Sequence, residues 1–249
     1  MIPKIVHYCW FGGKPLQGIV KSCVKTFDKI GEKKEWNESN CSFIENKYVM
    51  DAVKDNGFAY LSDYYRLKVL YEYGGIYLDT DIEVKKKIEP LFFDYDLVLG
   101  YMYDCYISTA FIMARPRHPF IKKLLDKYET MDYNPHYANN YLMTMTLLET
   151  YPQLKLNGKT CEFDERCILF AKEYFEAPII FCEGGYCVHH FTGYWKKQPN
   201  ILYQVLRPLI KKFLYHCHPI NVLYNKWGRK KALLTNPCYQ RYLIDKDSK

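Results

Sequence analysis

The chain has 249 residues and a formal net charge of +7, and 49% of its residues are hydrophobic. Aromatic residues make up 17%, so the composition is too apolar for an intrinsically disordered chain. A chain of this length buries a sizeable core as one large domain or two small ones. No apolar run reaches the roughly 18–20 residues of a membrane span. The N-terminus also lacks the basic-then-apolar order of a signal peptide.

In chain order, the first element is an apolar, β-prone strand over 2–10 that ends in a Gly-Gly turn. Apolar spacing then predicts helices over 18–30, 47–56, 60–73, 119–128 and 139–151. Further strands are expected over 76–79, 96–101, 109–114, 179–182 and 186–189. Strands that alternate with helices predict a layered α/β domain. We expect this domain to cover residues 1–197, with a basic helical extension over 198–249.

The net positive charge comes from the last quarter of the chain. Residues 1–183 contain 23 basic and 26 acidic residues, a net charge of −3, whereas 184–243 contains ten basic residues and no acidic one. Amphipathic helices with cations beside aromatics are typical of segments that bind anionic lipid, so we expect residues 200–231 to bind an anionic membrane surface. Packing of the apolar face on the domain is the alternative. Nucleic acid is not expected, because no nucleic-acid motif accompanies the charge.

The ten cysteines form no CxxC pair. Without a secretory signal, we expect reduced thiols and a protein at the cytoplasmic face of the membrane. Cys182, Cys187, His189 and His190 offer an alternative zinc site, although their spacing is not that of a standard zinc motif.

The most informative stretch is residues 60–81. Ser62 is a suitable N-cap for the helix, and the glycine pair at 74–75 is suited to end the helix and reverse the chain into a strand. Asp79 and Asp81 follow that strand, and open α/β sheets bind their ligands at the carboxyl ends of strands. The stretch therefore predicts a ligand site at this edge of the sheet.

Two pairs of charged residues in this stretch suggest the chemistry. Asp79 and Asp81 are two residues apart, so in an extended segment both point to the same side and can face one cation. Carboxylates without a neighbouring base suit Mg²⁺ or Mn²⁺. Asp63 and Arg66 share a helix face, where a carboxylate and a guanidinium can grip a polyol or a phosphate. A surface ion pair and an acidic strand end are the alternative.

Several separated motifs together resemble the DXD-motif, sugar-binding glycosyltransferases of glycosyltransferase family 32, which are related to capsular and surface polysaccharide glycosyltransferases. The motifs that carry the resemblance are Ile2 to Gly13, Glu35-Trp36-Asn37, Ser62-Asp63-x-x-Arg66, Leu70-Tyr71-x-x-Gly74-Gly75-Ile76-Tyr77-Leu78-Asp79-Thr80-Asp81, and His189-His190-Phe191-Thr192-Gly193-Tyr194-Trp195. The likeness spans about 1–197, and its motifs occur in the family's order.

The resemblance implies a GT-A-like fold, a Rossmann-type mixed sheet flanked by helices, and a metal-dependent hexosyltransferase that retains the anomeric configuration. It implies that Asp79 and Asp81 hold Mn²⁺ or Mg²⁺, with His190 completing the metal shell. The other implied site residues are Asp63 and Arg66 on the donor sugar, Trp10 on the base with Phe11 and Gly12 nearby, and Trp195 with His190 over the diphosphate.

The same resemblance implies a nucleotide-sugar donor, with uridine diphosphate as the family expectation, and a glycan or lipid-linked glycan acceptor in cell-surface polysaccharide synthesis. Retention without a clear carboxylate nucleophile suggests front-face attack, in which the departing phosphate helps to deprotonate the acceptor. Asp104 is a candidate base, although an ordinary solvated loop aspartate explains it as well.

Two other functions are open. A phosphatase of the haloacid dehalogenase type also places a DxD motif at a strand end, but it normally has Thr or Val two residues later, where this chain has Glu83. An inactive relative that only scaffolds other enzymes at a membrane is the second alternative. The intact acidic and basic residues of the 60–81 stretch argue against it.

Overall fold

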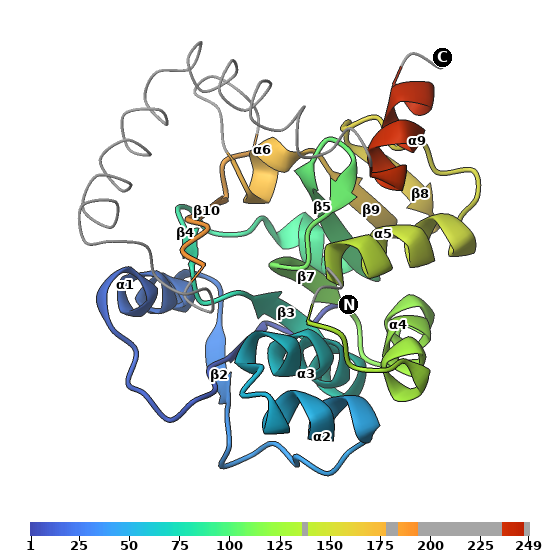
Figure 1. Cartoon of the computed structure of the whole chain (residues 1–249). Helices are drawn as coiled ribbons and strands as arrows, with labels where there is room; N and C mark the ends of the chain where they lie inside the picture. The colour runs from blue at the N-terminus through green and yellow to red at the C-terminus, as the bar shows by residue number, and fades with distance from the viewer. Residues whose placement is uncertain (136–138, 178–183, 194–235, 247–249) are drawn as a thin grey trace, which may run out of the picture.

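The computed structural model describes residues 1–135, 139–177, 184–193 and 236–246. An eight-stranded mixed sheet forms its centre (Figure 1). Its strands are β1 (Ile5–Cys9), β2 (Glu32–Trp36), β3 (Gly75–Leu78), β5 (Leu97–Tyr103), β6 (Tyr106–Ile107), β7 (Phe111–Ala114), β8 (Cys161–Asp164) and β9 (Cys167–Phe170). The strand order is β2-β1-β3-β7-β5-β9-β8, with β6 paired to β5.

The sheet combines parallel and antiparallel pairs. Strand β1 is parallel to both β2 and β3, and β5 is parallel to β9. Strand β7 runs antiparallel between β3 and β5. The predicted α/β class, with a mixed sheet flanked by helices, is therefore confirmed.

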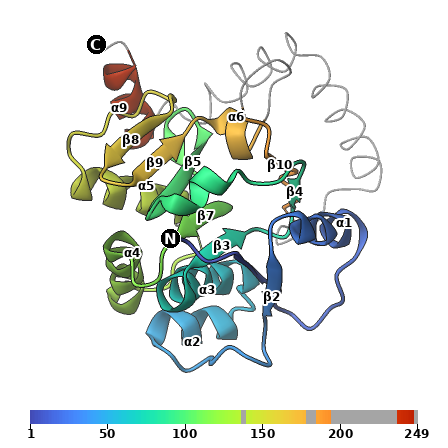
Figure 2. The ribbon, with the colours of Figure 1, turned by 180° about the vertical axis from the view of Figure 1, so that it is seen from behind.

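Helices cover both faces of the sheet (Figures 1 and 2). One face is covered by a group of helices that contact one another in sequence order: α2 (Lys47–Lys54), α3 (Phe58–Tyr73), α4 (Pro119–Thr130) and α5 (Asn139–Thr150). The elements of the other face are α1 (Gly18–Thr26), the 3-10 turns η1 (Phe27–Lys29) and η2 (Pro90–Asp94), and α6 (Lys172–Phe175).

Side-chain alternation along β3 divides the core between the two faces. Ile76 and Leu78 lie in the cluster beneath α1 and α6, whereas Tyr77 lies in the cluster beneath α2 to α5. All three residues are buried, as expected for a strand in the middle of a sheet. The carboxyl end of β3 is therefore fixed from both sides.

A second, two-stranded sheet pairs β4 (Ile82–Val84) with β10 (Cys187–His189) in antiparallel orientation. Strand β4 follows the Asp-Thr-Asp turn directly, and in its register His189 lies opposite Ile82. This pairing brings the segment after β10 alongside the turn, although the two are more than 100 residues apart in the sequence.

The last described helix, α9 (Pro237–Asp245), packs on the body of the domain near α5 (Figure 1). Cys238 is fully buried in the core beneath α5. The Asp245 side chain accepts a hydrogen bond of 2.9 Å from the backbone N–H of Leu156. The boundary at 197/198 stays a prediction, but this helix of the 198–249 segment does not stand apart from the domain.

Several local predictions need correction. Helix α3 begins at Phe58, two residues before the expected start, so Ser62 lies inside it and donates its hydroxyl to the Phe58 carbonyl instead of capping. Strand β2 was missed because its charged sequence lies at an exposed sheet edge, which is where natural edge strands carry lysine. The β8–β9 hairpin was missed as well.

Some expectations fall outside the described residues, namely the strand over 179–182, Trp195 and the basic segment 200–231. Among the residues that are described, no helix combines the length and apolarity needed to cross a membrane. The eight cysteines in the described ranges are free thiols.

The glycine pair between α3 and β3 is required by the backbone. Gly75 has a φ of 103°, and a Cβ there would lie 2.6 Å from the Ile5 carbonyl oxygen and 3.1 Å from His7 Nε2. The buried His7 ring donates from Nε2 to the Gly74 carbonyl (2.9 Å) and accepts at Nδ1 from the Trp36 indole (3.1 Å). Burial lowers the pKa of His7 to about 4, so the ring is neutral and both nitrogens are satisfied.

We predict that Gly75→Ala lowers the free energy of unfolding by about 2–4 kcal/mol, through backbone strain and the clash with β1. The matched control is Gly13→Ala, since Gly13 also has a positive φ (64°) but a Cβ added there would meet no heavy atom within 4 Å. The control should cost about 1 kcal/mol. Urea unfolding of both variants gives the comparison, and equal losses would contradict the proposed clash.

Candidate active site

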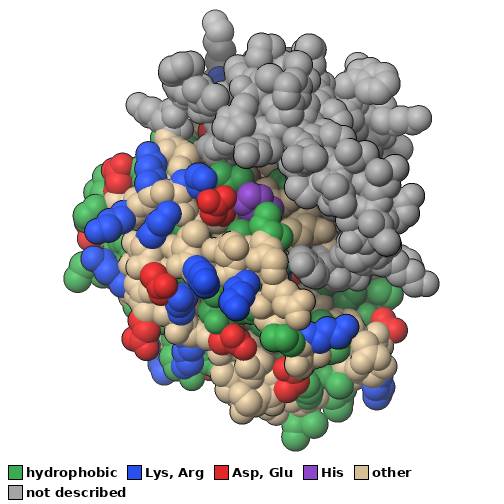
Figure 3. Space-filling view, turned by 90° about the vertical axis from the view of Figure 1, so that its left-hand side faces the viewer, with side chains coloured by type: hydrophobic (Ala, Val, Ile, Leu, Met, Phe, Trp, Pro, Cys, Tyr) green, Lys and Arg blue, Asp and Glu red, His purple; other side chains and the backbone are tan. Residues whose placement is uncertain are grey.

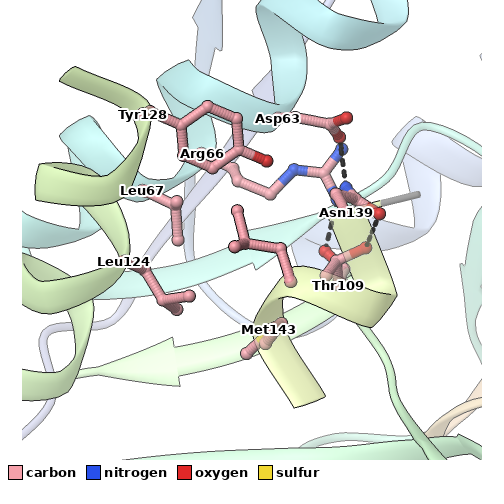
Figure 4. Close-up of a pocket in the computed structure, with 9 residues that line it drawn as sticks. Asp63, Arg66, Leu67, Thr109, Leu124, Tyr128, Asn139 and Met143 are labelled. Atoms are coloured by element: carbon pink, nitrogen blue, oxygen red, sulfur yellow. Dashed lines mark hydrogen bonds and ion pairs between the residues drawn. The ribbon is translucent and has the colours of Figure 1, made fainter. Parts of the chain in front are cut away.

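Arg66 is the centre of a buried polar cluster behind the Asp-Thr-Asp turn (Figure 4). Its guanidinium pairs with Asp63 at 2.9 Å and with Asp79 at 3.3 Å. Two further N–H groups donate to backbone carbonyls, of Thr109 at 2.6 Å and of Ser62 at 3.1 Å. With 5% of its surface exposed, Arg66 joins α3, β3 and the segment before β7.

Asp63 is held from a second side by α5. The side-chain amide of Asn139 donates to the Asp63 carboxylate, and the Thr109 hydroxyl donates to the Asn139 carbonyl oxygen at 3.2 Å. Asp63, Arg66, Thr109 and Asn139 line a small pocket whose other walls are apolar side chains of α3, α4 and α5 (Figure 4). Asn139 is therefore a member of the site that the sequence did not indicate.

Burial dominates the electrostatics of this cluster. It raises the pKa of Asp63 to about 7 against the opposing effect of Arg66, and it raises the pKa of Asp79 above its usual range for the same reason. Burial alone would lower the pKa of Arg66, but the carboxylates and Tyr77 raise it well above the usual value. One permanent guanidinium thus pairs with a buried carboxylate, Asp63, and a half-buried one, Asp79.

The Asp-Thr-Asp motif is a turn rather than the extended segment that was expected. The Ile82 N–H donates to the Asp79 carbonyl at 2.9 Å, and the Asp79 N–H donates to the Ala110 carbonyl at 2.9 Å. This turn still brings the two carboxylates to one side. Oxygen atoms of Asp79 and Asp81 and a ring nitrogen of His189 all lie within 4.8 Å of one another.

Asp81 is held by the segment that follows β10. Its carboxylate lies 3.2 Å from His189 Nε2 and accepts hydrogen bonds from the N–H (2.8 Å) and the hydroxyl (2.9 Å) of Thr192. Burial opposes ionisation, but His189 and these two hydrogen bonds hold the pKa of Asp81 well below its usual range. Asp81 is therefore ionised at neutral pH.

His190 was the histidine predicted to complete the metal shell, but the structure places the ring of His189 beside the aspartates. His189, not His190, lies beside the aspartates, and its Nδ1 donates to Glu176 at 2.6 Å. Adjacent residues at the end of β10 point to opposite sides, so the His190 ring contacts Glu83 at 3.0 Å. Although burial would lower the pKa of His189, the carboxylates of Glu176 and Asp81 raise it well above its usual value.

Three of the residues expected around a nucleotide base lie in the described part of the chain, and each has contacts within the protein. Trp10 is half-buried and its indole donates to the Lys14 carbonyl. Phe11 is buried in the core between Phe43 and Tyr65, so its ring fills the domain rather than a ligand site. The Gly12 N–H donates to the Glu38 side chain, and Trp195 lies outside the described residues.

Two other candidates are explained by ordinary contacts. Asp104, the possible base, forms an ion pair with Lys172. In the alternative zinc site, Cys187 is fully buried in the core beneath α1 and does not belong to the metal-capable group found among the described residues.

The donor set of Asp79, Asp81 and His189 fits a divalent cation. It offers two carboxylates from one turn and one imidazole from β10, two segments that the fold brings together. Mg²⁺ takes oxygen ligands almost exclusively, so the imidazole favours Mn²⁺ of the two expected ions.

Comparison with known families bears on this site directly. Residues 15–98 match the family described as the glycosyltransferase sugar-binding region containing a DXD motif. This range includes Asp63, Arg66 and the Asp-Thr-Asp turn, but not Thr109 or Asn139.

Curated proteins are similar to about half of the chain. Two of them are inositol phosphoceramide mannosyltransferases 3 and 1 of Schizosaccharomyces pombe. They are 27% identical over 150 residues (58% of this chain, 41% of the relative) and 25% identical over 152 residues (56% and 46%). An uncharacterized glycosyltransferase of Acanthamoeba polyphaga mimivirus is 28% identical over 138 residues (48% and 52%). The chain thus spans about half the length of these relatives.

Among solved structures, the chain is similar to the PaToxG glycosyltransferase, with 20% identity and a TM-score of 0.48. The match covers 61% of this chain and 70% of that one. The range matched by the family, 15–98, contains Asp63, Arg66, Asp79 and Asp81, whereas His189 and Thr192 lie outside it.

Proposed function

We propose that the chain is a metal-dependent glycosyltransferase with a GT-A-type fold that moves a sugar from a nucleotide sugar to an acceptor with retention of configuration. The observation that supports this most directly is the grouping of Asp79, Asp81 and His189 at the carboxyl end of β3. Two of these residues lie in the DXD sugar-binding region, and the third arrives from β10.

In this proposal Asp79, Asp81 and His189 hold Mn²⁺, or Mg²⁺ less well. The bound cation would neutralise the charge that develops on the leaving nucleoside diphosphate. Asp63 has 8% of its surface exposed, and its carboxylate accepts hydrogen bonds from hydroxyl groups of the donor sugar. Arg66 already donates to four groups of the protein. Its role is therefore to orient Asp63 and Asp79 rather than to grip the sugar alone.

We further propose a glycan or lipid-linked glycan acceptor and a role in cell-surface polysaccharide synthesis, at the cytoplasmic face of a membrane. Both mannosyltransferase relatives carry the name of a phosphate-bearing lipid. In the described body, Figure 3 shows Lys and Arg side chains gathered on the face that carries α1. Helix α1 and the segment that follows β4 carry five exposed lysines, namely Lys21, Lys25, Lys85, Lys86 and Lys87. They would add to the attraction of residues 200–231 for anionic lipid.

A donor screen with Mn²⁺ tests the proposal. We expect nucleotide release from one nucleotide sugar well above the others, in a panel of uridine diphosphate sugars and mannose nucleotides, and faster release with the correct acceptor. Nucleoside diphosphate detection gives the rate, and proton NMR of the product gives the anomeric configuration. Chelation of the metal should remove the release.

The alternatives predict different results from the same samples. A phosphatase of the haloacid dehalogenase type would release phosphate from monoesters without an acceptor. An inactive scaffold would bind vesicles of anionic lipid but release no nucleotide from any donor. Inverted product would contradict the retaining mechanism while leaving the transferase intact.

A further inference from the structure

A buried glutamate outside the sugar-binding region connects the separate parts of the metal-capable group. Glu176 follows α6 directly and has 1% of its surface exposed. One carboxylate oxygen accepts from His189 Nδ1 at 2.6 Å, and the other accepts from the fully buried hydroxyl of Ser108. With both oxygens engaged and no access to solvent, this carboxylate is poorly placed to bind a substrate.

The contacts of Glu176 lead to both aspartates. On one side, His189 links it to Asp81, with 3.2 Å between the ring Nε2 and the carboxylate. On the other side, the Ser108 oxygen accepts from the Ala110 N–H at 3.1 Å, and the Ala110 carbonyl accepts from the Asp79 N–H at 2.9 Å. Glu176 is therefore connected to all three candidate ligands, since the turn itself joins Asp79 to Asp81.

The backbone strengthens the same arrangement. The His189 N–H donates to the Glu176 carbonyl at 3.0 Å, so both the main chain and the ring of His189 are fixed by one residue. A histidine that donates from Nδ1 to a carboxylate presents Nε2 as its ligand nitrogen, and such partners orient many metal-bound histidines.

We propose that Glu176 is a positioning residue that fixes His189 so that Nε2 faces the cation held by Asp79 and Asp81. This inference rests on the proposed metal site and adds a residue that neither the motif nor the matched region contains. Ser108 is the support that holds the Glu176 carboxylate in place.

The test is the affinity of the metal-free protein for Mn²⁺, measured from the electron paramagnetic resonance signal of free Mn²⁺ without donor or acceptor. Glu176→Gln keeps the size of the side chain but removes its charge, and we expect about a 10- to 100-fold weaker Kd for Mn²⁺. Mg²⁺ binding, measured by competition, should fall less, because Mg²⁺ depends less on the imidazole. The preference for Mn²⁺ should therefore decrease.

The chain offers a matched control at the neighbouring histidine. Glu83 pairs with His190 at 3.0 Å, so Glu83→Gln removes the same glutamate–histidine contact outside the group of three. This variant should keep the wild-type affinity for Mn²⁺. Ser108→Ala gives a milder second variant, with a several-fold loss, in case Glu176→Gln folds poorly.

Each outcome bears on the inference. Equal Mn²⁺ affinity in Glu176→Gln and Glu83→Gln, with Ser108→Ala also unchanged, would overturn the positioning role and leave the proposed transferase standing. A lower melting temperature without a change in Mn²⁺ affinity would reduce Glu176 to a structural residue. A wild-type protein that binds no Mn²⁺ would overturn both proposals. Selective loss of Mn²⁺ affinity supports the inference even if the donor screen finds no transfer.

Discussion

Replacing Asp81 with asparagine should abolish sugar transfer and donor hydrolysis together while the fold survives. Asparagine keeps an oxygen that can accept from the Thr192 N–H and hydroxyl, which hold Asp81 in the native protein. It removes the negative charge from a group that offers its ligand atoms within 4.8 Å of Asp79 and His189. We expect kcat/KM to fall by about 10³-fold or more, since the lost cation stabilises the leaving group by several kcal/mol.

The measurement combines initial rates of nucleotide release, with and without acceptor, and Mn²⁺ affinity. Asp28→Asn is a matched control, because Asp28 is an exposed carboxylate that pairs with Lys33 at 2.8 Å. It should keep activity and Mn²⁺ binding. An Asp81→Asn protein with near wild-type rates would refute the metal assignment, and one that loses hydrolysis without losing Mn²⁺ affinity would place Asp81 on the donor instead.

Replacing Arg66 with methionine should cost more stability than any exposed ion pair in the described chain. The variant keeps most of the aliphatic bulk but leaves Asp63 and Asp79 in a buried site without their cation. Removal of one partner from a buried ion pair typically costs about 3–5 kcal/mol, because the remaining charge stays desolvated. Urea unfolding at pH 7 measures the loss.

Two further variants separate the causes. Arg115 pairs with Asp96 at 3.2 Å and its side chain is 37% exposed, so Arg115→Met should cost less than about 1 kcal/mol. Combining Arg66→Met with Asp63→Asn removes one of the stranded charges and should restore part of the lost stability. If the double variant is no more stable than Arg66→Met, the loss comes from packing rather than from unpaired carboxylates.

The local part of the site was predictable because it lies in one continuous stretch. Helix α3, the glycine pair and β3 follow from apolar spacing and the conformational freedom of glycine, and together they place Arg66 near Asp79. The extended geometry assumed for Asp79 to Asp81 was wrong, because a hydrogen-bonded turn joins β3 to β4. The two-residue spacing still predicted correctly that the carboxylates of Asp79 and Asp81 lie close together, since a tight turn also brings such residues close.

The distant part was not predictable in the same way. Asn139, Glu176 and Ser108 are single polar residues whose side-chain partners are 13 to 76 positions away, and no periodic pattern reports such pairings. Choosing between His189 and His190 depends on the register of β10 against β4. A one-residue shift in register exchanges the two faces of a strand, and the sequence of so short a strand does not specify it.

The docking of α9 changes how the basic segment must be studied. Thr192 contacts Asp81 on one side of that segment, and Cys238 and Asp245 are buried in the domain on the other. The described residues on both sides of 194–235 therefore belong to the folded domain. Deleting everything after residue 200 would remove a core element, so lost vesicle binding would not be specific to charge. Substituting the lysines and arginines of residues 194–235 with glutamine, with α9 intact, isolates their contribution to vesicle binding.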